Sequence, residues 1–135
     1  MVGFLLDTNH LSAAVKPKSL VRQRIQKVRE MGAWVGTCAP ALCELEVGIL
    51  EVWDLASYRS ALKKLLTKLR IWPLDTETAR LYGEIYHELR RKGRVLSQVD
   101  MMLAALTRRM NLILLTSDRD FEALPDLPVE NWLES

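Results

Sequence analysis

The sequence predicts an α/β fold in which helices cover both faces of a short parallel sheet. Short apolar runs alternate along the chain with longer segments of helical periodicity. Strands that alternate with helices imply parallel crossover connections, and these build a helix–sheet–helix arrangement. A length of 135 residues, 49% hydrophobic and 27% charged, suits one soluble domain with a sizeable core.

The first part of the chain sets this alternation. The apolar run 2–6 predicts a buried strand. Residues 19–31 predict a helix, because apolar residues recur at helical spacing and Gly32 follows as a stop. A second short strand is expected at 33–37. Residues 40–52 predict a helix whose first turn holds a proline, where a missing backbone N–H costs little.

The middle of the chain repeats the pattern. Residues 54–69 predict a helix with one apolar face, which Asp54 could cap. The run 70–74 predicts a third strand. A further helix begins at a cap formed by Asp75 or Thr76, and it ends just before Gly93.

The last part contains the most apolar helix and the most apolar strand. Residues 97–110 predict the helix, 112–116 a fourth strand and 127–132 a short final strand. In open sheets of this kind the active crevice lies beyond the carboxyl ends of the strands. The residues that follow strands are therefore the first candidates for a functional site.

The charges are unevenly distributed, although the net charge is only +2. Residues 16–29 carry six basic side chains and no acid, and 90–94 form a second basic cluster. The tail 118–135 carries six acids. Basic surface away from an acidic pocket suits a polyanionic substrate. On charge alone, solvated helix faces are the favoured interpretation.

The sequence shows no targeting or membrane signal. The N-terminus lacks the basic region and the long apolar run of a signal peptide, and no run approaches the ~18 apolar residues of a membrane span. A cytoplasmic protein without membrane contact is expected. Cys38 and Cys43 are expected to be reduced core thiols.

Several acids fall at the expected crevice. Asp7 follows the first strand and Asp118 the fourth, while Asp100 opens the apolar helix 97–110. The helix after the second strand offers Glu44 and Glu46, and helical spacing does not choose between them by polarity. Glu44 shares a face with small residues, Ala41 and Gly48, which would allow close approach to the sheet.

Each acid also has a structural explanation. Asp7 could cap a helix, Ser97 and Asp100 have the spacing of a capping box, and Asp118 could cap a turn. Three or four carboxylates in one crevice would repel one another, however, and a divalent cation would remove that conflict. Oxygen ligands favour Mg²⁺ or Mn²⁺. Without a glycine-rich phosphate loop, nucleic-acid phosphodiester hydrolysis is favoured over nucleoside-triphosphate hydrolysis.

Four segments resemble PIN-domain proteins in order and spacing, and most closely the VapC-type toxins of toxin–antitoxin pairs. They are "FLLDTNHLS" (4–12), "ALCELEVGI" (41–49), "VDMMLAAL" (99–106) and "LLTSDRDF" (114–121). The resemblance spans nearly the whole chain. It implies a single PIN domain over 1–135, with a PIN-like three-layer α/β/α sandwich around a short central parallel sheet.

The resemblance also implies a function and a set of site residues. The activity would be that of a metal-dependent endoribonuclease using Mg²⁺ or Mn²⁺. The matching acids, carried over as catalytic residues and metal ligands, are Asp7, Glu44, Asp100 and Asp118, with Asn9 and Thr116 as their supports. Val99 stands where many members carry Asn, and the family varies between Asp and Asn at the position of Asp118. Homodimerisation and a cognate VapB-type antitoxin are implied as well.

Two other functions compete with this one. The first is a non-catalytic PIN-like module that binds RNA or protein. The second is a phosphoacceptor signalling domain, which is disfavoured because no lysine follows any of the predicted strands.

Two local expectations complete the sequence prediction. Asp118 should point into the crevice, while Asp120 caps the turn or pairs with a basic side chain, and Phe121 returns to the core. The apolar face of 55–69, together with Leu50 and Trp53, should meet an antitoxin or a second subunit.

Overall fold

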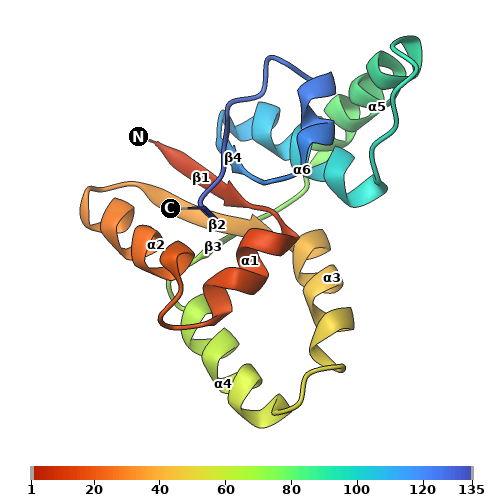
Figure 1. Cartoon of the computed structure of the whole chain (residues 1–135). Helices are drawn as coiled ribbons and strands as arrows, with labels where there is room; N and C mark the ends of the chain where they lie inside the picture. Colours follow the sequence, from red (N-terminus) through yellow and green to blue (C-terminus); the bar gives the residue numbers. More distant parts are fainter. Residues whose placement is uncertain (1, 135) are drawn as a thin grey trace.

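The computed structural model describes residues 2–134 and contains one five-stranded parallel sheet in the order β3–β2–β1–β4–β5 (Figure 1). The strands are β1 (Gly3–Leu6), β2 (Trp34–Cys38), β3 (Arg70–Trp72), β4 (Ile113–Leu115) and β5 (Val129–Glu130). The helices are α1 (Thr8–Val15), α2 (Leu20–Glu30), α3 (Ala39–Ile49), α4 (Leu55–Leu66), α5 (Thr76–Arg91), α6 (Gln98–Met110) and the 3₁₀ helix η1 (Arg119–Ala123).

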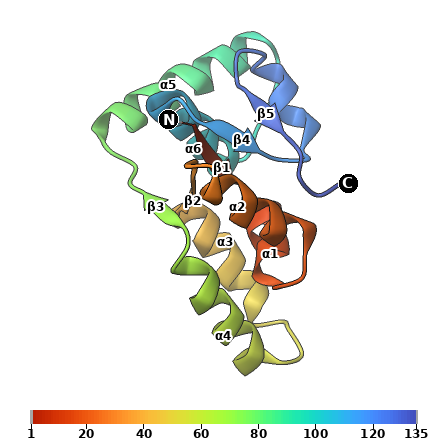
Figure 2. The same cartoon turned by 90° about the vertical axis from the view of Figure 1, so that its left-hand side faces the viewer.

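The strand order explains how the helices are layered. From β1 the chain adds β2 and then β3 on one side, and it returns to place β4 on the other side of β1. Since parallel crossovers are right-handed, this reversal sends the helices before and after it to opposite faces. Figures 1 and 2 show α1–α4 on one side of the sheet and α5 with α6 on the other. The expected three-layer α/β/α fold is confirmed.

The point of reversal lies between β1 and β4, two largely buried strands. All four residues of β1 are buried, and so are Leu114 and Leu115 of β4. The two strands pair from Phe4 with Ile113 to Leu6 with Leu115. Open α/β sheets bind ligands outside the carboxyl ends of the strands at such a reversal. The topology therefore directs attention to the residues directly after β1 and β4.

Side-chain caps fix where α1, α2, α4, α5, α6 and η1 begin, whereas α3 begins with a proline in its first turn. In each capped helix a side-chain oxygen of the cap accepts a hydrogen bond from a backbone N–H in the first turn of the helix. The capping residues are Asp7, Ser19, Asp54, Asp75, Ser97 and Asp118. Asp75, and not Thr76, caps α5. The expected stops also hold, because Gly32 and Gly93 follow α2 and α5 with φ of 91° and 64°.

Two elements were not predicted, and two local expectations were wrong. The prediction contained neither helix α1 nor η1, and α3 ends at Ile49, short of residue 52. Gly48 is exposed and a Cβ there would meet nothing, so it permits no close approach to the sheet. Cys38 is a buried free thiol as expected, but Cys43 is an exposed one.

The basic segment 16–29 is not only a solvated surface. Arg22 is buried, and its guanidinium donates hydrogen bonds to the carbonyl oxygens of Ala14 (2.8 Å) and Val15 (3.4 Å) at the end of α1. These are the carbonyls that a helix end leaves without partners. Arg22 thus joins α2 to α1. No helix within residues 2–134 is long and apolar enough to cross a membrane.

Candidate active site

A cavity of about 360 Å³ lies at the carboxyl ends of β1 and β4. It is lined by Asp7, Thr8, Asn9, Glu44, Ser97, Asp100 and Asp118. All four acids expected at the site face this one cavity, and they come from four separate segments: the β1–α1 turn, α3, α6 and the β4–η1 turn. Contacts that connect these segments therefore determine how each carboxylate is presented.

Asp7 is the most deeply held of the four acids. It is 6% exposed, and its backbone N–H donates to the carbonyl of Leu115 at 3.1 Å, which ties the end of β1 to β4. Its Oδ1 accepts the backbone N–H of His10 at 2.8 Å and lies 3.0 Å from His10 Nδ1. Asp7 is thus a helix cap and a cavity-lining acid at once.

Glu44 and Glu46 have different partners. The Thr8 hydroxyl donates to Glu44 Oε1 at 2.5 Å, which connects α3 to the turn that carries Asp7. Glu46 points to α4, where its carboxylate lies 2.7 Å from the guanidinium of Arg59. Glu44 therefore lines the cavity, whereas Glu46 forms an ion pair with Arg59 of α4.

Asp100 shows the electrostatic strain of the cluster. It lies in the first turn of α6, where its backbone N–H donates to Ser97 Oγ at 3.1 Å. The pKa of Asp100 is raised to about 6, and burial is the largest cause. A hydrogen bond with Ser97 lowers this pKa in part, and the negative charges of Asp118, Glu44 and Asp7 contribute to raising it. Burial of a carboxyl group, with other carboxylates nearby, disfavours its charged form and produces such a shift.

Asp118 lines the cavity and also caps the turn, as its structural explanation allowed. Its Oδ1 accepts the backbone N–H of Asp120 at 2.8 Å, and its own N–H donates to Thr116 Oγ1 at 3.0 Å. The prediction that Asp120 caps the turn or pairs with a basic side chain is therefore wrong. Asp120 supplies the amide, and no salt bridge within residues 2–134 involves its carboxylate. Its exposed side chain lies outside the lining of the cavity. Phe121 is buried, as expected.

The supporting residues differ partly from those expected. Thr116 is buried and holds the backbone of Asp118, whereas Asn9 is an exposed residue of the cavity lining. Sequence reasoning did not assign a supporting role to Thr8 or His10. Thr8 could have been suspected from its place beside Asp7, but no local pattern signals its contact with Glu44.

The donor set fits a hydrated divalent cation. Carboxylate oxygens are the ligands that Mg²⁺ and Mn²⁺ prefer, and a cation would relieve the repulsion evident at Asp100. Within residues 2–134, no three His, Cys, Asp or Glu side chains stand ready to hold an ion directly. Mg²⁺ commonly keeps several waters and binds one or two carboxylates. Acids spread around a cavity can reach such an ion partly through water.

The sequence comparisons cover almost the whole chain. A family model described as the PIN domain matches residues 4–127. The chain is 25% identical over 130 residues to ribonuclease VapC2 of Rickettsia felis, covering 96% of this chain and 97% of that protein. It is 27% identical over 136 residues to the tRNA(fMet)-specific endonuclease VapC of Salmonella typhimurium, covering 98% and 99%.

Solved structures agree with the observed architecture. The VapBC2 structure from Rickettsia felis, bound to a promoter DNA fragment, aligns with a TM-score of 0.86 at 23% identity over 97% of this chain and 99% of that chain. The DNA-bound VapBC structure from Salmonella typhimurium aligns with a TM-score of 0.82 at 25% identity, covering 98% and 99%. Given the family match over residues 4–127, the chain belongs to the PIN domain family.

Proposed function

We propose that this protein is the endoribonuclease toxin of a VapBC-type toxin–antitoxin pair. One observation carries the proposal: Asp7, Glu44, Asp100 and Asp118 line one cavity at the point where the strand order reverses. Family membership and full-length similarity to two VapC nucleases support it. The reaction is hydrolysis of an RNA phosphodiester bond.

The four acids would act on the reaction through Mg²⁺ or Mn²⁺. A bound ion lowers the pKa of a coordinated water and stabilises charge on the phosphoryl oxygens. Asp7 offers a carboxylate fixed by its contacts with His10, and Thr8 fixes that of Glu44. Thr116 holds the Asp118 turn, and Asn9 can reach the substrate or a water from the cavity wall.

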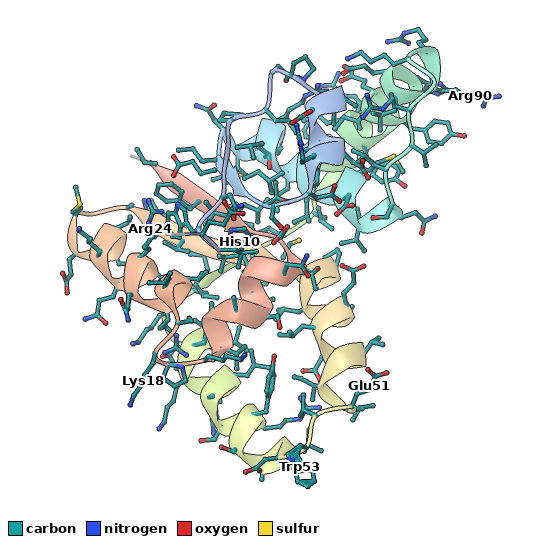
Figure 3. The ribbon with its side chains drawn as sticks, in the orientation of Figure 1. His10, Lys18, Arg24, Glu51, Trp53 and Arg90 are labelled. Carbon is teal, nitrogen blue, oxygen red and sulfur yellow. The ribbon has the colours of Figure 1, made fainter. Side chains whose placement is uncertain are left out.

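The RNA backbone requires cationic side chains beside this acidic cavity. In the segment 16–29, Arg22 is committed to the end of α1, and Arg24 lies over the ring of Trp132 at 4.8 Å. Lys16 and Lys18 are exposed. In the cluster 90–94, Arg90 points outward from the end of α5 (Figure 3).

A cognate VapB-type antitoxin is the proposed protein partner. The relatives were solved as VapBC complexes, and α3 with the following turn exposes apolar side chains. Val47 and Leu50 are mostly exposed, and Trp53 is 97% exposed at the outer tip of the α3–α4 arm (Figure 3). Such a patch marks an interaction surface. A homodimer belongs to the same proposal, and light scattering of the purified chain tests it.

Cleavage of RNA by the purified chain tests the activity. We expect Mn²⁺-dependent cleavage of transfer RNA that a chelator abolishes and that Asp7→Asn removes. The initiator transfer RNA is the first substrate to test, given the name of the Salmonella relative. Glu46→Gln is the matched control, since that carboxylate pairs with Arg59. Binding of RNA without cleavage at any divalent cation would favour a non-catalytic PIN-like module.

A further inference from the structure

His10 is a completely buried histidine with one hydrogen-bond partner at each ring nitrogen. It is 0% exposed, and Figure 3 labels it within the interior, in the first turn of α1. Nδ1 lies 3.0 Å from Asp7 Oδ1, and Nε2 accepts the backbone N–H of Trp132 at 2.9 Å. The ring therefore joins the first turn of α1 to a residue 122 positions along the chain.

The two partners determine which ring nitrogen carries the proton. A backbone N–H can only donate, so Nε2 must offer its lone pair to Trp132. The proton of the neutral ring then lies on Nδ1, where it faces an acceptor, Asp7 Oδ1. The opposite tautomer would set two donors against each other at Nε2 and two acceptors at Nδ1.

Trp132 is itself held in place, so its backbone N–H occupies a fixed position beside His10 Nε2. The indole is 1% exposed and packs against Phe4 with ring centroids 4.9 Å apart. The guanidinium of Arg24 covers it at 4.8 Å, and its Nε1–H donates to Glu130 at 3.0 Å. The segment after β5 is thereby anchored on both the sheet and α2.

The consequence appears at Asp7. Both donors from His10 reach the same oxygen, Oδ1, and within residues 2–134 no donor reaches Oδ2. We infer that His10 is a positioning residue: held by Trp132 as the Nδ1–H tautomer, it engages Oδ1 and orients the Asp7 carboxylate, so that Oδ2 would be the oxygen left to hold a cation in the cavity. This role rests on the proposed metal-dependent function. The C-terminal segment thus supports the active site without touching it.

The tautomer can be observed directly in the metal-free protein. The chain contains only two histidines, and His87 is exposed. Long-range ¹H–¹⁵N spectra should show His10 with a protonated Nδ1 and an unprotonated Nε2, while His87 averages between tautomers. A protonated Nε2 at His10, or averaging there, would overturn the inference.

Two substitutions separate the two contacts of the ring. In His10→Asn the amide can occupy the place of Nδ1 and donate to Asp7, whereas the amide oxygen of His10→Gln can replace Nε2 and accept from Trp132. We expect His10→Gln to weaken Mn²⁺ binding about 10- to 100-fold, as measured by electron paramagnetic resonance of free Mn²⁺. His10→Asn should retain most of the affinity, and His87→Gln should match the parent.

The pattern of Mn²⁺ affinities distinguishes the possible outcomes. Equal affinity of His10→Gln and the parent would overturn the positioning role alone. Equal losses in both His10 variants would show a general packing role and would also overturn it. A parent that binds no Mn²⁺ would refute the proposed metal-dependent function and this role together. If neither variant folds, the tautomer spectrum of the parent still decides.

Discussion

The β1–α1 turn and the β4–η1 turn each present a capping aspartate to the cavity, but the two carboxylates are held by different numbers of contacts. Each follows a central strand and carries an aspartate that faces the cavity. In each, the carboxylate accepts a backbone N–H at 2.8 Å, from His10 in the first turn and from Asp120 in the second. Asp7 is buried and opens an eight-residue α-helix, whereas Asp118 is exposed and opens a five-residue 3₁₀ helix.

The two carboxylates differ in the hydrogen-bond donors that hold them. Asp7 has a second donor, the ring of His10, which is itself fixed by Trp132. For Asp118, Thr116 holds the backbone N–H, and within residues 2–134 the carboxylate has the turn amide of Asp120 as its one donor. A cap of this kind sets the direction of a side chain, but a second contact restricts its rotation. Asp7 should therefore be the fixed point of the site and Asp118 its adjustable member.

Asp7→Asn gives the largest expected effect. Asn caps helices well, so the fold should survive, but the site loses its best-positioned negative charge. RNA cleavage should fall about a thousandfold, equivalent to ~4 kcal/mol of transition-state stabilisation. Single-turnover cleavage at saturating Mn²⁺ measures this loss, and circular dichroism checks the fold. A folded variant with near-parental cleavage would remove Asp7 from the centre of the mechanism.

Asp118→Asn should have a smaller effect. The amide oxygen can still accept the N–H of Asp120, so the turn persists while one charge leaves the cavity. We expect cleavage to fall about tenfold at limiting Mn²⁺, the scale of groups that tune a metal site. Saturating Mn²⁺ should restore part of the lost cleavage. Losses equal to those of Asp7→Asn under both conditions would contradict the proposed difference between the turns.

The same comparison shows what the sequence could and could not predict. The apolar runs of β1 and β4 predicted both strands. Since ligands bind at the carboxyl ends of parallel strands, Asp7 and Asp118 were then expected at the same edge of the sheet. Local spacing also indicated the caps of α4 and α6, because a cap bonds to an amide only three residues away.

The contacts that support the site could not be predicted from the sequence, because they join distant parts of the chain. Thr8 meets Glu44 across 36 positions, and His10 meets Trp132 across 122. Spacing within α3 could not choose between Glu44 and Glu46, since Thr8 and Arg59 make the difference. Helix α1 was missed because its eight residues are too few for a clear apolar period.

Asp100 faces both turns, and its burial, together with the charges of Asp118 and Asp7, should make the stability depend on pH. Its pKa of about 6 lies above the ~3.9 of an unfolded chain, so between these values the native state binds more protons than the unfolded state. The stability that this group contributes therefore falls as pH rises from about 4 to 6, and the penalty is complete above that.

Asp100→Asn removes that penalty. Without metal at pH 7 the variant should melt about 3 °C or more above the parent, while losing cleavage. The difference should shrink toward pH 4, where the parent is protonated, and Mn²⁺ should raise the melting temperature of the parent more than that of the variant. Differential scanning fluorimetry over this pH range measures it. A parent more stable than the variant at pH 7 without metal would contradict this cost of a charged Asp100.

Asp120→Asn is the smallest expected change and the sharpest test of the second turn. Asp120 contributes its backbone N–H to Asp118, and the substitution leaves that group intact. Its side chain is exposed and lies outside the cavity lining, so stability should stay within about 0.5 kcal/mol of the parent. Cleavage should stay within about threefold, since an exposed surface charge contributes little. The assay should pair this variant with Asp118→Asn at limiting Mn²⁺. If Asp120→Asn is the inactive one of the two, the fourth acid of the site is Asp120, and the β4–η1 turn must rearrange to present it.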